Sequence, residues 1–236
     1  MALDCLAFKF SRKCNIYIIY RKYKSVALSS TGMPLELAAT VCSLWLGMQC
    51  TAKLGALELA IARYLAQLKD GSYSAHVEIN PQGLGKLIVP KLLASTEGTL
   101  SEKGEFLPEN YSFTRSGMFY QREEKTKFDH TTSTQHFESA RESKTTKLKP
   151  DVVDPLTAFL QFVLLGKVEK VVHSGQLYEL ELAQSRPGCY SGKLKEHEVK
   201  LSACFEPSRI YGELSAKAVG LVELECEPAI PDRAAF

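Results

Sequence analysis

The sequence predicts a mainly β protein built on an antiparallel sheet, with one core helix near residues 155–165. Stretches in which apolar and polar residues alternate follow one another from residue 54 onward, as half-buried strands do. Asp-Gly, Asn-Pro and Ser-Gly pairs separate these stretches, and such pairs favour turns. One segment has apolar residues at helical spacing directly after a capping residue. Many short strands with one helix indicate an antiparallel β architecture.

The composition is that of an ordinary globular chain. Of the 236 residues, 45% are hydrophobic and 24% are charged, which excludes a disordered or collagen-like protein. The net charge of +2 hides an asymmetry, because residues 1–32 carry six basic side chains and one acidic side chain. The rest of the chain has a small acidic excess, so it lacks the basic surface that binding of a phosphate backbone needs. We expect no nucleic-acid partner.

The N-terminal part of the chain has two interpretations. Leu37–Met48 is uncharged, follows a basic leader and resembles the apolar region of a secretory signal, although it is too short to span a membrane as a helix. Cleavage would then fall between about Cys50 and Gly55. The alternative is a first buried strand, since Trp45 and Leu46 suit a pleated surface. The two interpretations have equal weight on the sequence alone.

Eight stretches are predicted as strands, although the first is rich enough in Ala and Leu to leave a helix as its alternative. In order they are Leu54–Leu68, Tyr73–Ile79, Leu92–Leu100, Tyr111–Arg115, Met118–Asp129, Leu177–Leu182, Glu198–Phe205 and Gly220–Cys226. Asp70-Gly71 predicts a two-residue hairpin, and Gly83 and Gly85 bracket a loop or a short helical turn. We therefore divide the chain into a basic leader or possible signal region (1–43) and a single antiparallel β domain (44–236).

Residues 121–149 differ from the rest of this domain. They hold seven Lys or Arg, five Asp or Glu and nine Ser or Thr, with few apolar residues among them. A run of mixed charge is usually a solvated face. This region is predicted as exposed strands with little core contact, or as a partly ordered loop.

The helix has the most explicit signals. Asp154 is a candidate N-cap, and Pro155 occupies the first helical position, where its missing N–H costs nothing. Gly166 can adopt the left-handed conformation that ends a helix. We predict that Pro155–Leu165 is helical and packs on the sheet, with Phe159 nearly inaccessible. The buried stripe is expected to comprise Leu156, Phe159, Leu160 and Val163.

The order of these pieces resembles the bacterial family described as domain of unknown function 3108. Its landmarks here are Lys53–Leu59, Asp70–Tyr73, Gly83-Leu84, Phe106–Tyr111, Phe128-Asp129, Asp154–Ala158 and Ser174–Leu182. They cover roughly residues 44–205, and the resemblance is not evident after Tyr211. The resemblance implies an elongated, curved antiparallel sheet in an exported envelope protein without assigned chemistry. That shape is similar to the half-barrels that carry lipoproteins between bacterial membranes, which is an analogy of fold and not of function.

The sequence identifies no chemical site. None of the seven cysteines forms a Cys-x-x-Cys pair, and they are expected to be small buried side chains, with Cys189 as a candidate accessible thiol. His130 and His136 flank a Thr-rich stretch but have no evident third metal ligand. His76 and His197 are expected to be exposed. No nucleotide-binding, hydrolase or zinc-protease motif is present. The prediction is therefore no catalytic, cofactor-binding or metal-binding residue, and no assigned ligand-binding residue.

These observations favour a non-enzymatic protein of the periplasm or cell envelope, with the cytoplasm as the alternative location. An apolar concave face would suit a lipid or acyl ligand. The alternative function is a protein-interaction scaffold that binds an envelope partner through a sheet edge.

Overall fold

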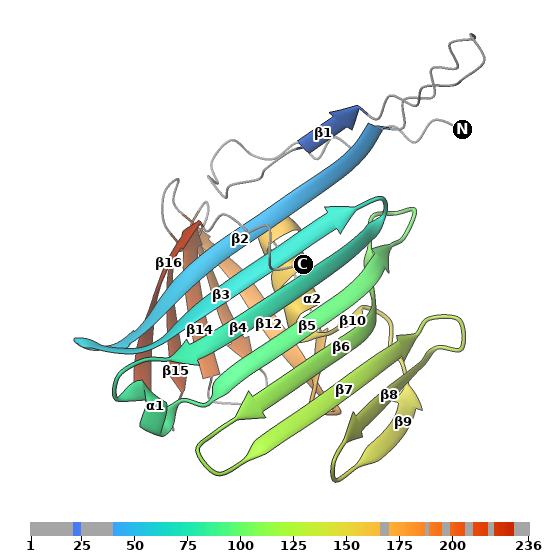
Figure 1. The fold of residues 1–236 in the computed structure, drawn as a ribbon. Helices are drawn as coiled ribbons and strands as arrows, with labels where there is room; N and C mark the ends of the chain where they lie inside the picture. The colour runs from blue at the N-terminus through green and yellow to red at the C-terminus, as the bar shows by residue number, and fades with distance from the viewer. Residues whose placement is uncertain are drawn as a thin grey trace, which may run out of the picture.

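The computed structural model describes residues 21–24, 40–165, 170–186, 189–194, 199–205, 210–216 and 220–228. Within these residues sixteen strands join one sheet, in which β10 (Val152–Val153) and β11 (Lys170–His173) are the parallel pair. The sheet is strongly curved and is not closed into a barrel (Figure 1). The predicted fold class, a mainly β curved sheet with one core helix, is confirmed.

The curved sheet has two walls that meet at β2 (Thr40–Leu54), and β1 (Arg21–Lys24) pairs with β2 beside them. The first wall continues through β3 (Leu57–Lys69), β4 (Ser72–Pro81), β5 (Lys91–Leu100), β6 (Phe106–Ser116), β7 (Gln121–Asp129), β8 (Thr134–Ser139) and β9 (Ser143–Lys147). The second wall continues through β16 (Gly220–Pro228), β15 (Ile210–Ala216), β14 (Val199–Phe205), β13 (Cys189–Leu194) and β12 (Gln176–Arg186) to β11 and β10. The edges of the sheet are therefore β9 and β10.

The turns of the first wall alternate between two rims because neighbouring strands are antiparallel. The β2–β3 turn, α1 (Gly85–Ile88) and the β6–β7 turn lie at one rim, here named the α1 rim (residues 54–57, 82–91 and 115–122), along the lower left of Figure 1. The β3–β4, β5–β6 and β7–β8 turns lie at the other, here named the cavity rim (residues 69–72, 100–106, 129–134 and 147–151). Asp70 and Gly71 have positive φ, which confirms the predicted two-residue hairpin.

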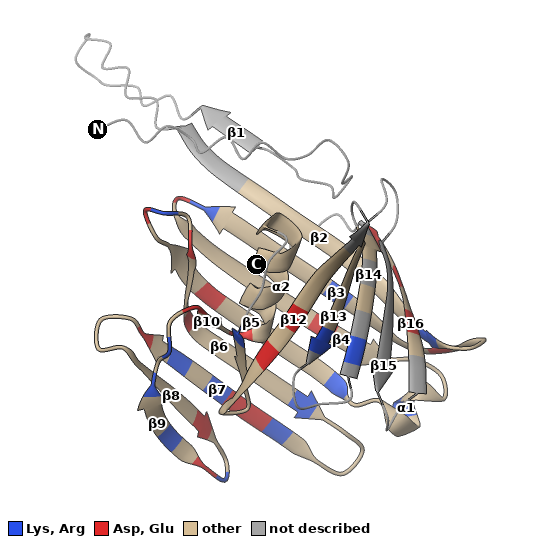
Figure 2. Ribbon diagram, turned by 180° about the vertical axis from the view of Figure 1, so that it is seen from behind, with Lys and Arg blue, Asp and Glu red and all other residues tan. Residues whose placement is uncertain are grey.

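Helix α2 (Pro155–Leu165) lies inside the curve, between the two walls, in both views (Figures 1 and 2). Its range is the predicted one. It contacts β4, β5 and β6 on one side and β11 on the other. Leu156 and Leu160 are buried as predicted.

Phe159 and Val163, however, are only partly buried, so the prediction that Phe159 is nearly inaccessible is wrong. Ala158 and Phe162 are buried instead, where they pack with Val153 near the second wall. The helical spacing predicted one buried stripe, whereas a helix enclosed by two walls buries two faces.

The charged segment 121–149 forms strands β7, β8 and β9, and the prediction of little core contact is only half correct. Its outward side chains are exposed, but Glu124, Thr126, Phe128 and Phe137 are buried on the concave face. Alternation along each strand explains this result, since every second side chain points inward whatever the mean composition.

The uncharged stretch at residues 37–48 lies largely in β2, the strand between β16 and β3. Leu46, Met48 and Cys50 are buried core residues, so the interpretation as a first strand fits the structure. The strand begins at Thr40 and crosses the boundary expected between residues 43 and 44. Cleavage between Cys50 and Gly55 would remove most of this strand, and the signal interpretation of that stretch stays a prediction. The helices of the described residues include none long and apolar enough to span a membrane.

Candidate ligand-binding site

A cavity of about 870 Å³ opens at the cavity rim, between the turns of the first wall and helix α2. Its apolar lining comes from Phe106, Leu107, Leu148, Val152, Val153 and Leu165. Its charged lining comes from Glu102, Lys103, Glu105, Lys147, Lys149 and Asp151. The site therefore joins an apolar base to a charged mouth, an arrangement that suits an amphipathic molecule.

The apolar base is fixed by packing. Phe106 is buried and meets the ring of Tyr73 edge to face, with the ring centroids 5.0 Å apart. Val152 and Val153 form β10 and are also buried. Leu165, the last residue of α2, is 37% exposed, which is the largest exposed fraction among the apolar residues that line the cavity. A bound ligand could therefore cover apolar surface at this residue.

The walls of the mouth are held by hydrogen bonds between turns. His130 Nε2 lies 2.7 Å from the Pro108 carbonyl oxygen, and the Leu148 N–H donates to the Ser133 carbonyl at 2.9 Å. Asp129 accepts hydrogen bonds from Thr131 and Thr132, which lower the pKa of its carboxyl group. These bonds position the mouth before any ligand binds.

A buried polar cluster lies where α2 begins. Asp154 is fully buried and confirms its predicted role as N-cap, since its Oδ1 accepts from the N–H groups of Leu156 and Thr157 at 2.9 and 3.0 Å. Its Oδ2 accepts from the hydroxyls of Thr96 at 2.8 Å and Thr157 at 2.5 Å. The Thr157 hydroxyl donates its only hydrogen to Asp154. The Tyr73 hydroxyl, 2.9 Å away, therefore donates its own hydrogen bond to the Thr157 oxygen. Burial raises the pKa of Asp154, against the effect of these bonds.

A second buried polar group connects the second wall to the inner face of the first. Glu124 is 3% exposed, pairs with Arg122 at 2.5 Å and accepts a 2.6 Å hydrogen bond from the Ser174 hydroxyl. His173 packs edge to face on Phe113, with centroids 4.9 Å apart, and burial lowers its pKa. The carboxylates of Asp154 and Glu124 both have hydrogen-bond donors within the protein, and we interpret both residues as structural.

The outer face of the first wall has a shallow groove of about 620 Å³ lined by polar side chains of β4 to β8. These groups bind one another across the strands: Ser95 pairs with Ser112 at 2.8 Å, and Asn110 donates to Glu97 at 2.8 Å. Such cross-strand pairs are typical of a solvated sheet face.

The candidate residues named from sequence do not form a common site. His130 contacts a backbone carbonyl at the cavity, whereas His136 lies on β8 and contacts Thr145 at 2.9 Å. His76 is exposed, as expected, and His197 lies outside the described residues. Among the described residues, no group of three or more His, Cys, Asp or Glu side chains is placed to hold a metal ion.

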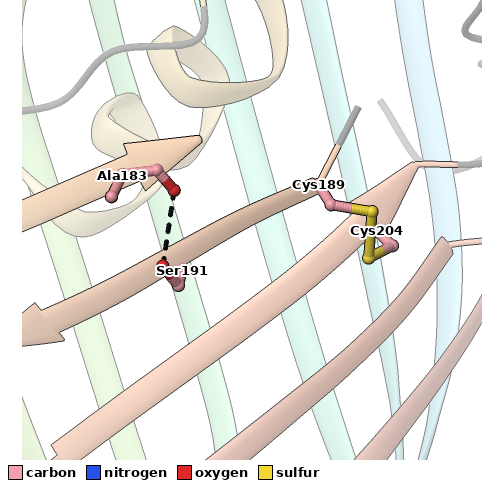
Figure 3. The surroundings of a disulfide bond; sticks show 4 residues. All are labelled: Ala183, Cys189, Ser191 and Cys204. Atoms are coloured by element: carbon pink, nitrogen blue, oxygen red, sulfur yellow. Dashed lines mark hydrogen bonds between the residues drawn. A yellow bond between two sulfur atoms is a disulfide. The ribbon is translucent and has the colours of Figure 1, made fainter. Parts of the chain in front are cut away.

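The predicted accessible thiol at Cys189 is wrong, because Cys189 is buried and forms a disulfide with Cys204 (Figure 3). These two residues face each other across β13 and β14, and Ser191 on the same strand donates a hydrogen bond to the Ala183 carbonyl. Cys50 and Cys226 form a second disulfide, across β2 and β16. Sequence separations of 15 and 176 residues gave no pattern by which to pair them.

The cavity residues were not identified from the sequence, since they come from three turns and the end of a helix. The available signal was Leu148, an apolar residue between two lysines in a polar segment. Comparison with protein-family models, curated proteins and solved structures finds no match for this chain. The site must therefore be interpreted from its own geometry.

Proposed function

We propose that this protein is a non-enzymatic binding protein of the cell envelope that holds an amphipathic, acyl-type ligand in the cavity at the cavity rim. The observation that supports this proposal most is the 870 Å³ cavity, which combines a buried apolar base with lysines at its mouth. A pocket of this size and lining is typical of sites for small ligands.

The concave face as a whole is not the proposed site. Helix α2 and the side chains around Tyr64, Tyr73 and Leu160 fill the middle of the curve. An acyl chain would instead lie in the cavity beside Val153 and Phe106, and would cover the apolar surface of Leu165 that water now reaches. Three lysines and three carboxylates line the mouth. Of these, Lys147 and Lys149 would pair with an anionic head group.

The proposed location has indirect support. The two disulfides are compatible with an oxidising compartment, such as a bacterial periplasm. A scaffold that binds through a sheet edge has less support, because the edge strand β9 is short and bears Lys144 and Lys147. Lysines on an edge strand oppose pairing with a further strand.

The test has two parts. Mass spectrometry of the natively purified protein should detect a co-purifying lipid, and a fluorescent fatty acid should bind the delipidated protein saturably. Leu165→Glu should weaken this binding by about tenfold or more, since it places a charge against the acyl chain. Lys149→Glu should weaken it because the head group would then meet a carboxylate.

The matched control is Lys127→Glu, the same charge reversal at an exposed position of the outer groove. It should leave fatty-acid binding unchanged. Absence of saturable binding, or equal loss in Lys149→Glu and Lys127→Glu, would refute the proposal.

A further inference from the structure

The α1 rim presents large apolar side chains to solvent at three separate turns. Phe119 and Met118 at the β6–β7 turn are 91% and 68% exposed, and Leu87 and Ile88 of α1 are 69% and 66% exposed. Leu57, beside the β2–β3 turn, is 49% exposed. Of the nine large hydrophobic residues exposed in the described chain, eight lie at this rim, and the ninth is Leu165 at the cavity.

Tight packing of the backbone holds these side chains outward. A Cβ on Gly85 would lie 1.9 Å from the Leu59 carbonyl oxygen, so α1 lies directly on β3 and only glycine fits at that position. The Gln82 N–H also donates to the Leu59 carbonyl, at 2.9 Å. Leu84, Leu87 and Ile88 are therefore exposed on a turn of helix that β3 supports. Figure 1 shows α1 at this end of the first wall.

The β6–β7 turn has a similar support. The Gly117 N–H donates to the Tyr120 carbonyl at 2.8 Å, and a Cβ on Gly117 would lie 2.4 Å from the Tyr120 ring. The Arg115 guanidinium lies 5.6 Å from the centre of the same ring. Phe119 is left at the tip of this closed turn.

The charges of the two rims differ. In residues 82–91 and 115–122 the charged side chains are Lys86, Lys91, Arg115 and Arg122, all of them basic, whereas the β8–β9 turn at the same end of the wall adds Arg141 and Glu142. Lys91 and Arg122 have acidic partners behind the rim, in Glu78 and Glu124, whereas Lys86 is exposed on α1. The cavity rim carries acidic and basic side chains together, as in its 100–106 turn with two glutamates and one lysine.

We propose that the α1 rim docks the protein on a lipid bilayer that contains anionic head groups. Apolar side chains at the tips of separate turns can each enter the boundary between head groups and acyl chains, and the basic side chains beside them meet lipid phosphates. A fluid bilayer can accommodate apolar side chains that protrude from three separate turns of one rim. Residues 82–91 and 115–122 contain no acidic side chain, so this part of the rim favours a membrane with negative charge. In this orientation the ligand cavity opens on the side away from the bilayer.

The experiment is sedimentation of the full chain with vesicles of phosphatidylcholine, with and without phosphatidylglycerol. We expect the protein to bind the anionic vesicles more tightly, and added salt to weaken this binding. Lys86→Glu should lower the affinity for anionic vesicles by about tenfold. Phe119→Ser should lower the binding to both kinds of vesicle, since it removes an exposed apolar contact and breaks none in the core.

Lys69→Glu, the same charge reversal at an exposed position of the cavity rim outside the cavity lining, is the matched control and should bind vesicles like the unmodified chain. The proposal is overturned if the protein sediments with neither kind of vesicle, or if Lys69→Glu reduces binding as much as Lys86→Glu. It is also overturned if the chain is an oligomer in solution that Phe119→Ser converts to a monomer, because the rim would then contact a second copy. Phe119→Ser should leave fatty-acid binding unchanged. Loss of vesicle binding in this variant therefore tests the membrane-docking proposal separately from the proposal of a ligand in the cavity.

Discussion

The Thr96 hydroxyl on β5 donates a 2.8 Å hydrogen bond to Oδ2 of Asp154, the residue that begins helix α2. Both residues are buried, and the same carboxylate receives two backbone N–H groups and the Thr157 hydroxyl. Asp154 therefore does more than cap the helix, because it also joins the helix to the first wall. A buried carboxylate is tolerated here because each of its oxygens has two donors.

Asp154→Ala should lower the free energy of unfolding by about 3 kcal/mol, whereas loss of an exposed cap would cost about 1 kcal/mol. The larger value follows because the substitution leaves the buried hydroxyls of Thr96 and Thr157 without their acceptor. Urea unfolding of Asp154→Ala and Thr96→Val, singly and together, measures the coupling between the two residues. Additive losses would show that the Thr96 bond contributes nothing to stability.

The two central apolar residues of α2, Phe159 and Leu160, should contribute unequally to stability, although the sequence predicted both of them to be buried. Leu160 is fully buried, so Leu160→Ala should cost about 3–5 kcal/mol of stability. Phe159 is only partly buried and meets Tyr64 edge to face at 4.7 Å, so Phe159→Ala should cost about 2 kcal/mol. A larger loss in Phe159→Ala, measured by thermal or urea unfolding, would contradict this arrangement.

Local signals predicted α2 and the Asp70-Gly71 hairpin, because a cap, a proline and a turn pair act within a few residues. The sequence could not indicate that α2 is enclosed on two sides, which decides the burial of Phe159 and Phe162. Strands β13 and β15 were missed because Gly192 and Gly212 interrupt their apolar alternation, and pairing with their neighbours forms them. The cavity depends on how the β5–β6 and β7–β8 hairpins meet the connection between β9 and β10, and no local pattern specifies this arrangement.

The two disulfides should contribute unequally to stability. Cys50–Cys226 joins residues 176 positions apart, and Cys189–Cys204 joins residues 15 apart. Closing the longer loop restricts the unfolded chain more, so replacing both Cys50 and Cys226 by Ala should cost about 2 kcal/mol more than the same change at Cys189 and Cys204. Peptide mapping without reductant checks the pairing, and urea unfolding of the two double variants checks the order. Equal losses would contradict the loop-length argument.

Stability should fall on acidification because of His173. Burial lowers the folded-state pKa of His173, with Arg122 acting in the same direction and Glu124 opposing it. An unfolded histidine titrates near about 6.5, so between that pH and the lower folded pKa the unfolded chain binds more protons. The stabilisation is therefore present above about pH 6.5 and is lost as the pH falls through the interval, by about 1.4 kcal/mol for each pH unit between the two pKa values.

His173→Gln removes the titrating group while keeping a polar side chain near the Tyr111 hydroxyl, which lies 3.4 Å from His173 Nδ1. The free energy of unfolding of this variant, measured by urea at several values between about pH 5 and pH 7.5, should depend less on pH than that of the unmodified chain. His76→Gln, at an exposed position on the outer face, should keep the original dependence. Parallel curves for His173→Gln and the unmodified chain would show that His173 is as free to take up a proton in the folded protein as in the unfolded one, and the packing of His173 against Tyr111 and Phe113 would have to be revised.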